Sequence, residues 1–351
     1  TRNRKGKKVT AQNLIGTHEF VDLKRGLYAF VTIDDITLGP ALGGIRMSSY
    51  RDLDDARYDS MRLARAMTRK NAVAHLPNGG GKMVIVGNPQ TDKREALYRF
   101  VGESINSLKG AYIAAVDVGW DSIDLAAVSA HSPHVVGLAR QGGSSSDTEE
   151  MTAVGVLAGI RALLAHIAQT NEVSLKDWYF TLQGIGKVGR HVGVHLYRAG
   201  ARQMCISDVL EERARLLKRV YSHEGVKIIH PDTVFDQRSD IFVPCARGDI
   251  LTNETIERLA NADVCAIAGS ANNQLAEPEE RMAELLHERH ILYVPDFVIN
   301  AGGVVDCAEK LTGNYSPART QKRVLEIGPR VRDILSRAEA KNCSPYFIAL
   351  A

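Results

Sequence analysis

Three glycines in the second half of the chain have the spacing of a phosphate-binding turn. They follow the apolar run 179–183 and precede a stretch with helical periodicity. In a strand, turn and helix of this kind, glycines allow a tight turn and close backbone approach, and the helix N-terminus binds phosphate. We therefore predict a dinucleotide site at the segment made of Gly184, Ile185, Gly186, Lys187, Val188 and Gly189.

An acidic residue stands where an acid that binds the adenosine ribose is expected. Asp208 follows the next apolar run, 24 positions after Gly184, and a separation of about 20 is usual. Because a carboxylate there repels a 2′-phosphate, the sequence favours NAD over NADP. Arg213 is the one nearby cation that could soften this exclusion, and its place on a predicted helix indicates a solvent-facing side chain.

Composition excludes several other classes of protein. The 44 basic and 41 acidic residues give a formal net charge of +3 and are mixed along the chain, so we expect no nucleic-acid partner. No apolar run reaches the roughly 18 residues of a membrane span, and no leader is recognised, so we expect a soluble, cytoplasmic protein. The basic cluster 2–8 is expected to be a solvated terminus.

The cysteines are odd in number and widely spaced, with no C-x-x-C pair. We therefore expect reduced thiols and no metal site. They are Cys205, Cys245, Cys265, Cys307 and Cys343.

Periodicity predicts a mixed α/β domain in the first half. Apolar residues recur at helical spacing over 53–74, which places Lys70 near the C-terminal end of a helix. The remaining predicted elements, in chain order, are a strand and turn at 26–35, a glycine-rich loop at 37–46, a glycine turn at 79–81, a short strand at 83–86, a helix at 92–108 and a strand at 111–116 that delivers Asp117.

Short apolar strands alternate with helical segments in the second half, which predicts a parallel, doubly wound sheet. The predicted strands are 177–182, 203–206, 241–243, 264–268 and 291–294, with helices such as 153–168, 188–199 and 211–222. The polar run 141–148 reads as a linker, and a charged amphipathic helix at 320–340 is expected to pack back across both domains. Because 351 residues suffice for two cores, we predict domains at 1–142 and 143–325 and a C-terminal helix within 326–351.

Five further motifs, in order, resemble the glutamate, leucine, phenylalanine and valine dehydrogenase superfamily, and most closely its leucine and phenylalanine branch. They are GPALGGIRM (39–47), MTRKNAVAHLPNGGGK (67–82), VDVG (116–119), GSANNQL (269–275) and PDFVINAGG (295–303). The resemblance implies an N-terminal α/β domain for substrate binding and oligomerisation, a C-terminal Rossmann domain for NAD, and an active-site cleft between them. It also implies a homo-oligomeric enzyme that converts an amino acid to its 2-oxo acid and ammonia.

The resemblance implies roles for individual residues as well. Lys82 is implied as the catalytic lysine, Asp117 as the acid that exchanges protons, and Lys70 as the group that binds the substrate carboxylate. We expect the pKa of Lys82 to fall because its glycine neighbours remove water and because Lys70 adds a second cation. The other implied contacts to substrate or cofactor come from Gly43, Gly44, Thr152, Cys245, Ala246, Asn272, Asn273 and Asn300.

The implied pocket for the substrate side chain carries no charge. Its lining positions are Leu42, Ala115, Val304 and Cys307. A dicarboxylic substrate needs a cation there, so glutamate is disfavoured and an apolar amino acid is expected. Leucine, valine and an aromatic side chain all stay open, because one methylene changes discrimination by only ~1–3 kcal/mol.

Several residues depart from the pattern of the leucine branch. Acids at 147, 149 and 150 (Asp147, Glu149, Glu150) and the bulky Trp120 would favour a cationic or unusually large substrate, or weaken turnover, if they faced the cleft. Arg247 is a further departure beside the expected cofactor channel.

Two other classes of function compete with this interpretation. A non-catalytic NAD-binding relative is opposed by the retention of Lys70, Lys82 and Asp117. A hydroxy-acid dehydrogenase would need a histidine paired with a carboxylate, and the candidates His75, His131 and His134 stand in neither a glycine-rich nor a strand-end context.

Overall fold

The chain divides into two compact units. The computed structural model describes residues 14–138, 147–221 and 225–351. The first unit comprises Thr1–Ser145 and Cys307–Tyr315, and the second comprises Ser146–Asp306 and Ser316–Ala351. The basic cluster 2–8 and the predicted domain boundary after residue 142 lie outside the described residues.

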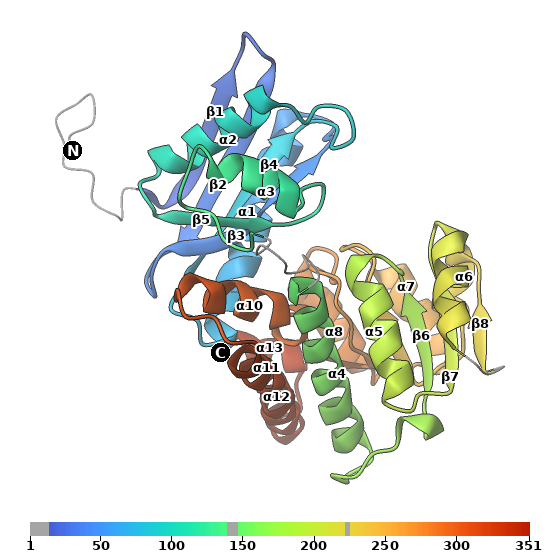
Figure 1. The fold of residues 1–351 in the computed structure, drawn as a ribbon. Helices are drawn as coiled ribbons and strands as arrows, with labels where there is room; N and C mark the ends of the chain where they lie inside the picture. Colours follow the sequence, from blue (N-terminus) through green and yellow to red (C-terminus); the bar gives the residue numbers. More distant parts are fainter. Residues whose placement is uncertain (1–13, 139–146, 222–224) are drawn as a thin grey trace. The chain divides into compact units, whose positions relative to one another are not determined.

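A five-stranded sheet in the order β1-β2-β4-β3-β5 forms the centre of the first unit (Figure 1). Antiparallel pairing joins β1 to β2 and β2 to β4, whereas β3 runs parallel to both β4 and β5. The strands are β1 (Gly16–Asp22), β2 (Leu27–Asp35), β3 (Ala41–Ser48), β4 (Gly79–Val86) and β5 (Tyr112–Val116).

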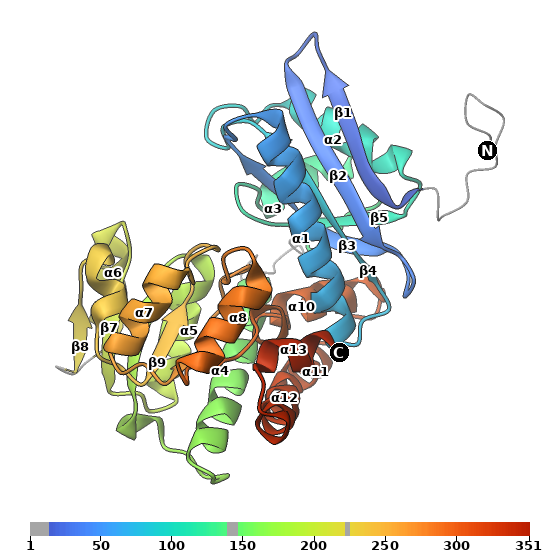
Figure 2. The same cartoon turned by 180° about the vertical axis from the view of Figure 1, so that it is seen from behind.

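Helices cover both faces of this sheet. α2 (Glu95–Ser107) and α3 (Ser122–Ser129) lie on one face in Figure 1, and α1 (Leu53–Val73) lies on the other in Figure 2. Successive strand residues point to opposite faces, so Met83 packs in the core with α2 while Val84 packs against α1. The buried positions of α1 follow helical spacing and are Ala56, Ser60, Leu63, Ala64, Lys70 and Asn71.

Two glycine-rich segments are strands, so the predictions of a loop at 37–46 and a turn at 79–81 were wrong for most of these residues. β3 covers Ala41–Ser48, and β4 begins at Gly79. A Cβ on Gly43 would collide with the carbonyl of Gly81, and one on Gly80 would collide with the backbone of Thr68. The glycines therefore permit close packing of β3, β4 and α1 rather than a change of chain direction.

The second unit contains a parallel sheet in the order β11-β10-β9-β6-β7-β8. Counted from β6, this is the 3-2-1-4-5-6 order of a dinucleotide-binding doubly wound fold, and it confirms the predicted fold class. The strands are β6 (Tyr179–Gln183), β7 (Gln203–Ser207), β8 (Val226–Ile228), β9 (Ile241–Pro244), β10 (Ala266–Ile267) and β11 (Leu292–Tyr293). The sequence patterns did not predict β8 or β1.

Helices and short 3-10 turns connect these strands and flank the sheet. They are α5 (Lys187–Arg198), α6 (Glu211–Val220), α7 (Asn253–Asn261), α8 (Glu279–Glu288), α9 (Asp296–Ile299), η2 (Leu175–Asp177) and η3 (Pro231–Asp236). α10 (Gly302–Leu311) follows α9 along the chain, and α13 (Pro345–Leu350) ends it.

A long helix, α4 (Asp147–Ile167), packs against α5, α11 (Pro317–Leu325) and α12 (Ile327–Lys341). The single helix predicted at 320–340 is therefore two helices, which meet at Glu326. Among the described residues, the stretch Thr148–Ile167 is long and apolar enough to span a membrane, so the expectation that no run reaches this length was wrong. Half of that stretch is buried within the protein, as in a core helix.

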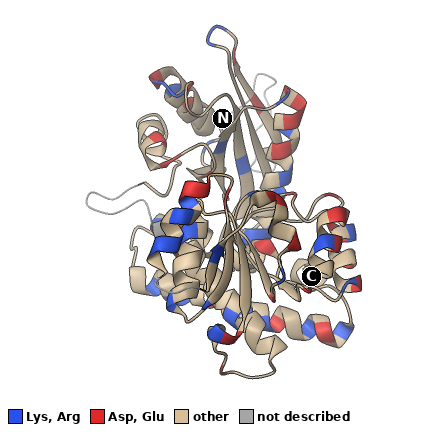
Figure 3. Ribbon diagram, turned by 90° about the vertical axis from the view of Figure 1, so that its right-hand side faces the viewer, with Lys and Arg blue, Asp and Glu red and all other residues tan. Residues whose placement is uncertain are grey.

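Acidic and basic residues are interspersed along the helices, as the red and blue segments of the ribbon in Figure 3 show. The five cysteines are free thiols. Within the described ranges, no group of three or more histidine, cysteine, aspartate or glutamate side chains is arranged to hold a metal ion.

Candidate active site

Lys82 and Asp117 meet on the face of the first unit's sheet that α1 covers. On one side of β3, Gly44 pairs with Ala115 of β5. On the other side, Leu42 pairs with Gly80 of β4, so Gly44, two residues further along, lies beside Lys82. Because Gly44 has no side chain, Lys82 reaches across β3 and its Nζ donates to Oδ2 of Asp117 at 2.6 Å. A Cβ on Gly44 would lie 2.7 Å from the Cβ of Asp117.

A tight turn directly after β5 holds Asp117. The amide of Trp120 donates to the carbonyl of Asp117 at 3.0 Å, and Gly119 has a φ of +76°. The amide of Met47 donates to the carbonyl of Val118 at 3.0 Å, which fixes the turn to β3. Trp120 is 2% exposed and packs edge-on against Tyr98, so this residue is part of the core and does not face a substrate.

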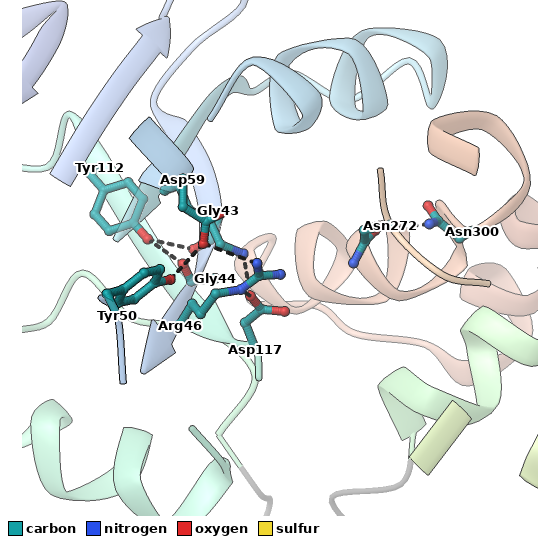
Figure 4. A network of polar contacts seen from close by, with 10 residues as sticks. Gly43, Gly44, Arg46, Tyr50, Asp59, Tyr112, Asp117, Asn272 and Asn300 are labelled. Atoms are coloured by element: carbon teal, nitrogen blue, oxygen red, sulfur yellow. Dashed lines mark hydrogen bonds and ion pairs between the residues drawn. The ribbon is translucent and has the colours of Figure 1, made fainter. Parts of the chain in front are cut away.

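A second network joins Asp117 to α1 (Figure 4). Arg46 of β3 donates from Nε to Oδ2 of Asp117 at 3.1 Å and from Nη1 to Oδ2 of Asp59 at 3.2 Å. The Tyr50 hydroxyl donates to the same oxygen of Asp59 at 2.6 Å. Our sequence interpretation missed Arg46, Asp59 and Tyr50; the signal for Arg46 was its position two residues after Gly44 in the GPALGGIRM motif.

Burial and charge set the pKa values of the central pair. Burial lowers the pKa of Lys82; the carboxylate of Asp117 opposes this, and the guanidinium of Arg46 lowers it further. Burial alone would raise the pKa of Asp117, but Lys82 and Arg46 outweigh it and hold that pKa well below its usual range. The predicted fall in the Lys82 pKa thus occurs, with Arg46 as the cation where the sequence prediction named Lys70.

Lys70 lies in the buried stripe of α1, one position before an anchoring asparagine. Only 9% of the surface of Lys70 is exposed to solvent. The side-chain amide of Asn71 donates to the carbonyls of Leu42 at 3.2 Å and Gly79 at 2.6 Å. These bonds fix the C-terminal end of α1 against the starts of β3 and β4, and so fix the backbone that carries Lys70.

The carbonyls of Gly43 and Gly44 accept hydrogen bonds from the buried hydroxyl of Tyr112 at 2.9 and 3.1 Å (Figure 4). Leu42 is fully buried and Ala115 is 7% exposed. Cys307 is buried within the first unit, and Val304 is half-buried within the second.

The glycine segment of the second unit fits a dinucleotide. Gly184 has a φ of +90°, and its added Cβ would meet Ala246 at 2.7 Å. A Cβ on Gly189 would collide with the carbonyl of Gly184 and would lie 3.1 Å from the Cβ of Cys245, whereas one on Gly186 would meet nothing within 4 Å. No side chain caps the N-terminus of α5, so its amides remain available to a phosphate.

Asp208 lies just beyond β7 and is tied to this segment. Its Oδ2 accepts from the amide of Ile185 at 2.7 Å and its Oδ1 from the amide of Leu210 at 2.8 Å. Arg213 is half exposed and lies 3.7 Å from Oδ1, so it faces Asp208 more closely than predicted. The buried oxygens of Gln183 and Ser207, at the ends of β6 and β7, have no hydrogen-bond partner among the described residues.

The predicted asparagines and Thr152 lie in the same unit as this segment. Asn300 donates from Nδ2 to Oδ1 of Asn272 at 2.9 Å and to the carbonyl of Ser270 at 3.2 Å. The amide of Asn273 donates to Asp296 at 2.7 Å. Thr152 donates its hydroxyl to the carbonyl of Thr148 at 2.8 Å.

The acids near the start of α4 have different surroundings. Glu150 lies 2.7 Å from Nδ1 of His191 and 2.8 Å from Nε2 of His195, so both of its oxygens are engaged by α5. Glu149 is half-buried, and the side chain of Asp147 lies outside the described residues. Arg247 is exposed. The engagement of Glu150 weakens the case for a cationic substrate.

Two of the candidate histidines have surroundings of their own. His131 lies 3.1 Å from Glu95 of α2, and α2 covers the opposite face of the sheet from Lys82. His75 stands at the end of α1 with a φ of +52°. His131 is therefore tied to the helix on the other face from Lys82 and Asp117, and His75 is exposed.

Comparisons with known proteins give a consistent result. A family model described as "Glu/Leu/Phe/Val dehydrogenase, dimerisation domain" matches residues 15–133, and one described as "Glutamate/Leucine/Phenylalanine/Valine dehydrogenase" matches residues 209–326. The chain is 40% identical over 328 residues to leucine dehydrogenase of Geobacillus stearothermophilus. That alignment covers 93% of this chain and 86% of the relative. Phenylalanine dehydrogenase of Lysinibacillus sphaericus is 38% identical over 330 residues, with coverage of 92% and 84%.

A solved structure has a similar fold along almost the whole chain. The crystal structure of L-tryptophan dehydrogenase from Nostoc punctiforme superposes with a TM-score of 0.74 at 32% sequence identity. The match covers 95% of this chain and 92% of that one.

Proposed function

Because the chain belongs to the glutamate, leucine, phenylalanine and valine dehydrogenase family, we propose that it uses NAD to deaminate an L-amino acid with an apolar side chain. It is an amino-acid dehydrogenase; the cofactor, the class of side chain and the residue roles are our proposals. The observation that carries the proposed deamination is the buried 2.6 Å hydrogen bond between Lys82 and Asp117. It supplies a lysine of lowered pKa beside a carboxylate, as proton chemistry at an imine requires.

In this proposal Lys70 binds the substrate carboxylate together with the backbone amides of Gly43 and Gly44. The burial of Lys70 supports this role, because a buried ammonium gains more from an anionic ligand than a solvated one does. The bonds of Asn71 to β3 and β4 hold the two parts of this carboxylate site together.

Lys82 acts as the base and Asp117 as the proton relay. After the α-carbon has lost a hydride, Lys82 as a free amine removes a proton from the water that attacks the imine carbon. Lys82 passes this proton to the ionised Asp117 through their 2.6 Å hydrogen bond, and Asp117 transfers it to the departing nitrogen. As the C–N bond breaks and the C=O bond forms, Lys82 takes up the remaining hydroxyl proton. The products are the 2-oxo acid, ammonia and reduced cofactor.

Bound NAD would supply the hydride acceptor in this reaction. The amides after Gly184 and Gly186 would bind its pyrophosphate, with Lys187, Val188 and Gly189 in the same helical turn. Asp208 would bind the adenosine ribose, which is the basis for proposing NAD over NADP. The residues proposed to position the nicotinamide half are Thr152, Cys245, Ala246, Asn273 and Asn300, with Asn272 at the substrate.

An apolar substrate side chain is supported by the uncharged positions assigned to its pocket. Leu42, Ala115, Val304 and Cys307 offer no cation to a second carboxylate. Leucine, phenylalanine and tryptophan are named for the relatives reported above, and the small side chain of Ala115 is compatible with either a branched or an aromatic substrate.

We also propose that the enzyme is a homo-oligomer in the cytoplasm. The family model over residues 15–133 is described as a dimerisation domain, which supports assembly through the first unit. Light scattering coupled to size-exclusion chromatography tests this proposal, and a strictly monomeric active enzyme would contradict it.

The proposed reaction has a direct test. The protein is incubated with NAD or NADP and a panel of L-amino acids at alkaline pH, and reduced cofactor is followed by its absorbance. We expect turnover with NAD and apolar amino acids, and loss of turnover in Lys82→Ala but not in Lys24→Ala, a matched change at an exposed lysine between β1 and β2. No turnover with any apolar amino acid would contradict the proposal.

A further inference from the structure

One carboxylate oxygen of Asp117 accepts from two cations. Lys82 donates to Oδ2 at 2.6 Å. Arg46 donates to the same atom at 3.1 Å (Figure 4). The family-derived mechanism uses Lys82 and leaves Arg46 without a role. Arg46 is nevertheless largely buried, with 20% of its side chain exposed, and each of its bonds ends on a carboxylate.

Resting on the proposed function, we propose that Arg46 is a positioning residue for the reaction: its guanidinium fixes the carboxylate of Asp117 against Lys82, and Asp59 moderates its charge. Nothing in this role requires Arg46 to touch the substrate. It acts through the orientation and charge of two groups that do.

The geometry requires an arginine and not simply a cation. Nε points to Asp117 and Nη1 points to Asp59, so one planar group joins the end of β5 to α1. A lysine has a single nitrogen and cannot keep both bonds in this fork geometry. Tyr50 completes the arrangement by donating to Asp59 at 2.6 Å, which holds the far carboxylate in place.

Arg46 and its two carboxylate partners have opposite effects on the pKa of Lys82. Burial lowers the pKa of Lys82; Arg46 lowers it further, while the carboxylates of Asp117 and Asp59 raise it. Besides these charges, the phenols of Tyr50 and Tyr112 lie close by, and burial raises the pKa of each, so both stay neutral. The other acidic and basic residues of α1, the helix that covers this face, are Asp54, Asp55, Arg57, Arg62, Arg65, Arg69 and Lys70. Removing Arg46 and removing the charge of Asp59 must therefore shift the titration of Lys82 in opposite directions.

The test measures kcat/KM against pH for the wild type and three variants, with the best apolar amino acid and saturating NAD. The acid limb of this profile is the range in which kcat/KM rises as Lys82 loses its proton. For Arg46→Gln we expect the midpoint of the acid limb to move to higher pH by roughly one unit and kcat to fall at least about tenfold. For Asp59→Asn we expect the limb to move down. Arg51→Gln is the matched control, because Arg51 is an exposed arginine that pairs with the surface acids Asp52 and Asp55. Its acid limb should match that of the wild type.

A purely structural role would lower activity without moving the limbs in opposite directions. Coincident acid limbs in Arg46→Gln, Asp59→Asn and wild type would therefore overturn the inference. If Arg46→Gln does not fold, Arg46→Lys is the deciding variant, because it keeps the positive charge but loses the two-nitrogen geometry of the guanidinium. We expect its acid limb to stay where it is in the wild type and its kcat to be about tenfold lower. An undiminished kcat in Arg46→Lys would overturn the inference. An inactive wild type would contradict the proposed function itself, whereas an active wild type with unmoved limbs would contradict only the role of Arg46.

Discussion

The Nζ atom of Lys82 lies 2.6 Å from Oδ2 of Asp117, and the two side chains are only 5% and 14% exposed. Two opposing influences therefore act on Lys82: burial lowers its pKa, and the adjacent carboxylate raises it. Burial prevails, so the free amine forms at a lower pH than it does for a lysine in water. The same contact keeps Asp117 ionised, with a pKa well below its usual range because its two cationic neighbours outweigh its burial.

The first prediction concerns the pH dependence of the wild type. Because the proposed base is the free amine, kcat/KM should rise with pH and level off once Lys82 has lost its proton. The midpoint of this acid limb should lie below 10.5, the ordinary value for lysine, since the pKa of Lys82 is lowered. Initial rates between pH 6 and 11 check this prediction. A rate that still rises steeply above the ordinary lysine value would contradict it.

The second prediction concerns the stability that Asp117 provides. Asp117→Asn leaves Lys82 and Arg46 buried without the negative charge that they share, so we expect the free energy of unfolding at neutral pH to fall by about 3 kcal/mol. The contribution of a carboxylate with a lowered pKa is present above its unfolded pKa of about 4 and is lost as the pH falls toward its folded pKa. The difference between wild type and variant should therefore shrink in acid.

Urea unfolding at several pH values measures this difference. The control is the double variant Lys82→Met with Asp117→Asn, which removes the unpaired ammonium and should recover part of the lost stability. A difference that stays constant from neutral pH to pH 3 would show that the charge of Asp117 is not its source.

The regular patterns in the sequence were enough to predict the elements that carry much of the site. Helical spacing predicted α1 and put Lys70 near its end, and the alternation of strands and helices predicted the parallel sheet with its glycine turn at Gly184. These predictions depend on local periodicity and on motifs whose residues are neighbours in sequence.

The network around Arg46 could not be predicted in the same way. Arg46, Asp59 and Asp117 meet because β3 lies between β4 and β5 and because α1 crosses the face that carries them. Sequence order does not reveal that strand order. The glycines of β3 and β4 misled the strand prediction for a related reason: their function depends on backbone atoms that approach from other elements, such as the carbonyl of Gly81 beside Gly43.

The third prediction separates packing from cofactor binding at the glycine segment. Gly186 has a φ of −75° and open space where a Cβ would lie, so Gly186→Ala should leave the Tm unchanged. It should raise the KM for NAD at least about tenfold, because the methyl group occupies space that the pyrophosphate needs. Gly189→Ala is the counterpart: its Cβ would collide with the carbonyl of Gly184, so we expect a fall in Tm. Thermal unfolding and cofactor titration measure both effects, and an unchanged KM in a stable Gly186→Ala would contradict the proposed site.

The last prediction concerns the choice between NAD and NADP. Asp208 already accepts from the amides of Ile185 and Leu210, so its charge is fixed at the rim of the glycine segment and repels a 2′-phosphate. Arg213, 3.7 Å from Asp208 and half exposed, is the cation able to offset that repulsion. We therefore expect the wild type to prefer NAD but to retain measurable activity with NADP.

Two variants test the opposing charges. Arg213→Gln should lower kcat/KM for NADP more than for NAD, whereas Asp208→Asn should narrow the preference for NAD. Asp208→Asn should also lower the free energy of unfolding by about 1–3 kcal/mol, because one backbone amide loses its acceptor. Steady-state kinetics with both cofactors measure the ratios; a preference that moves in the same direction in both variants would show that these two side chains do not oppose each other at the ribose.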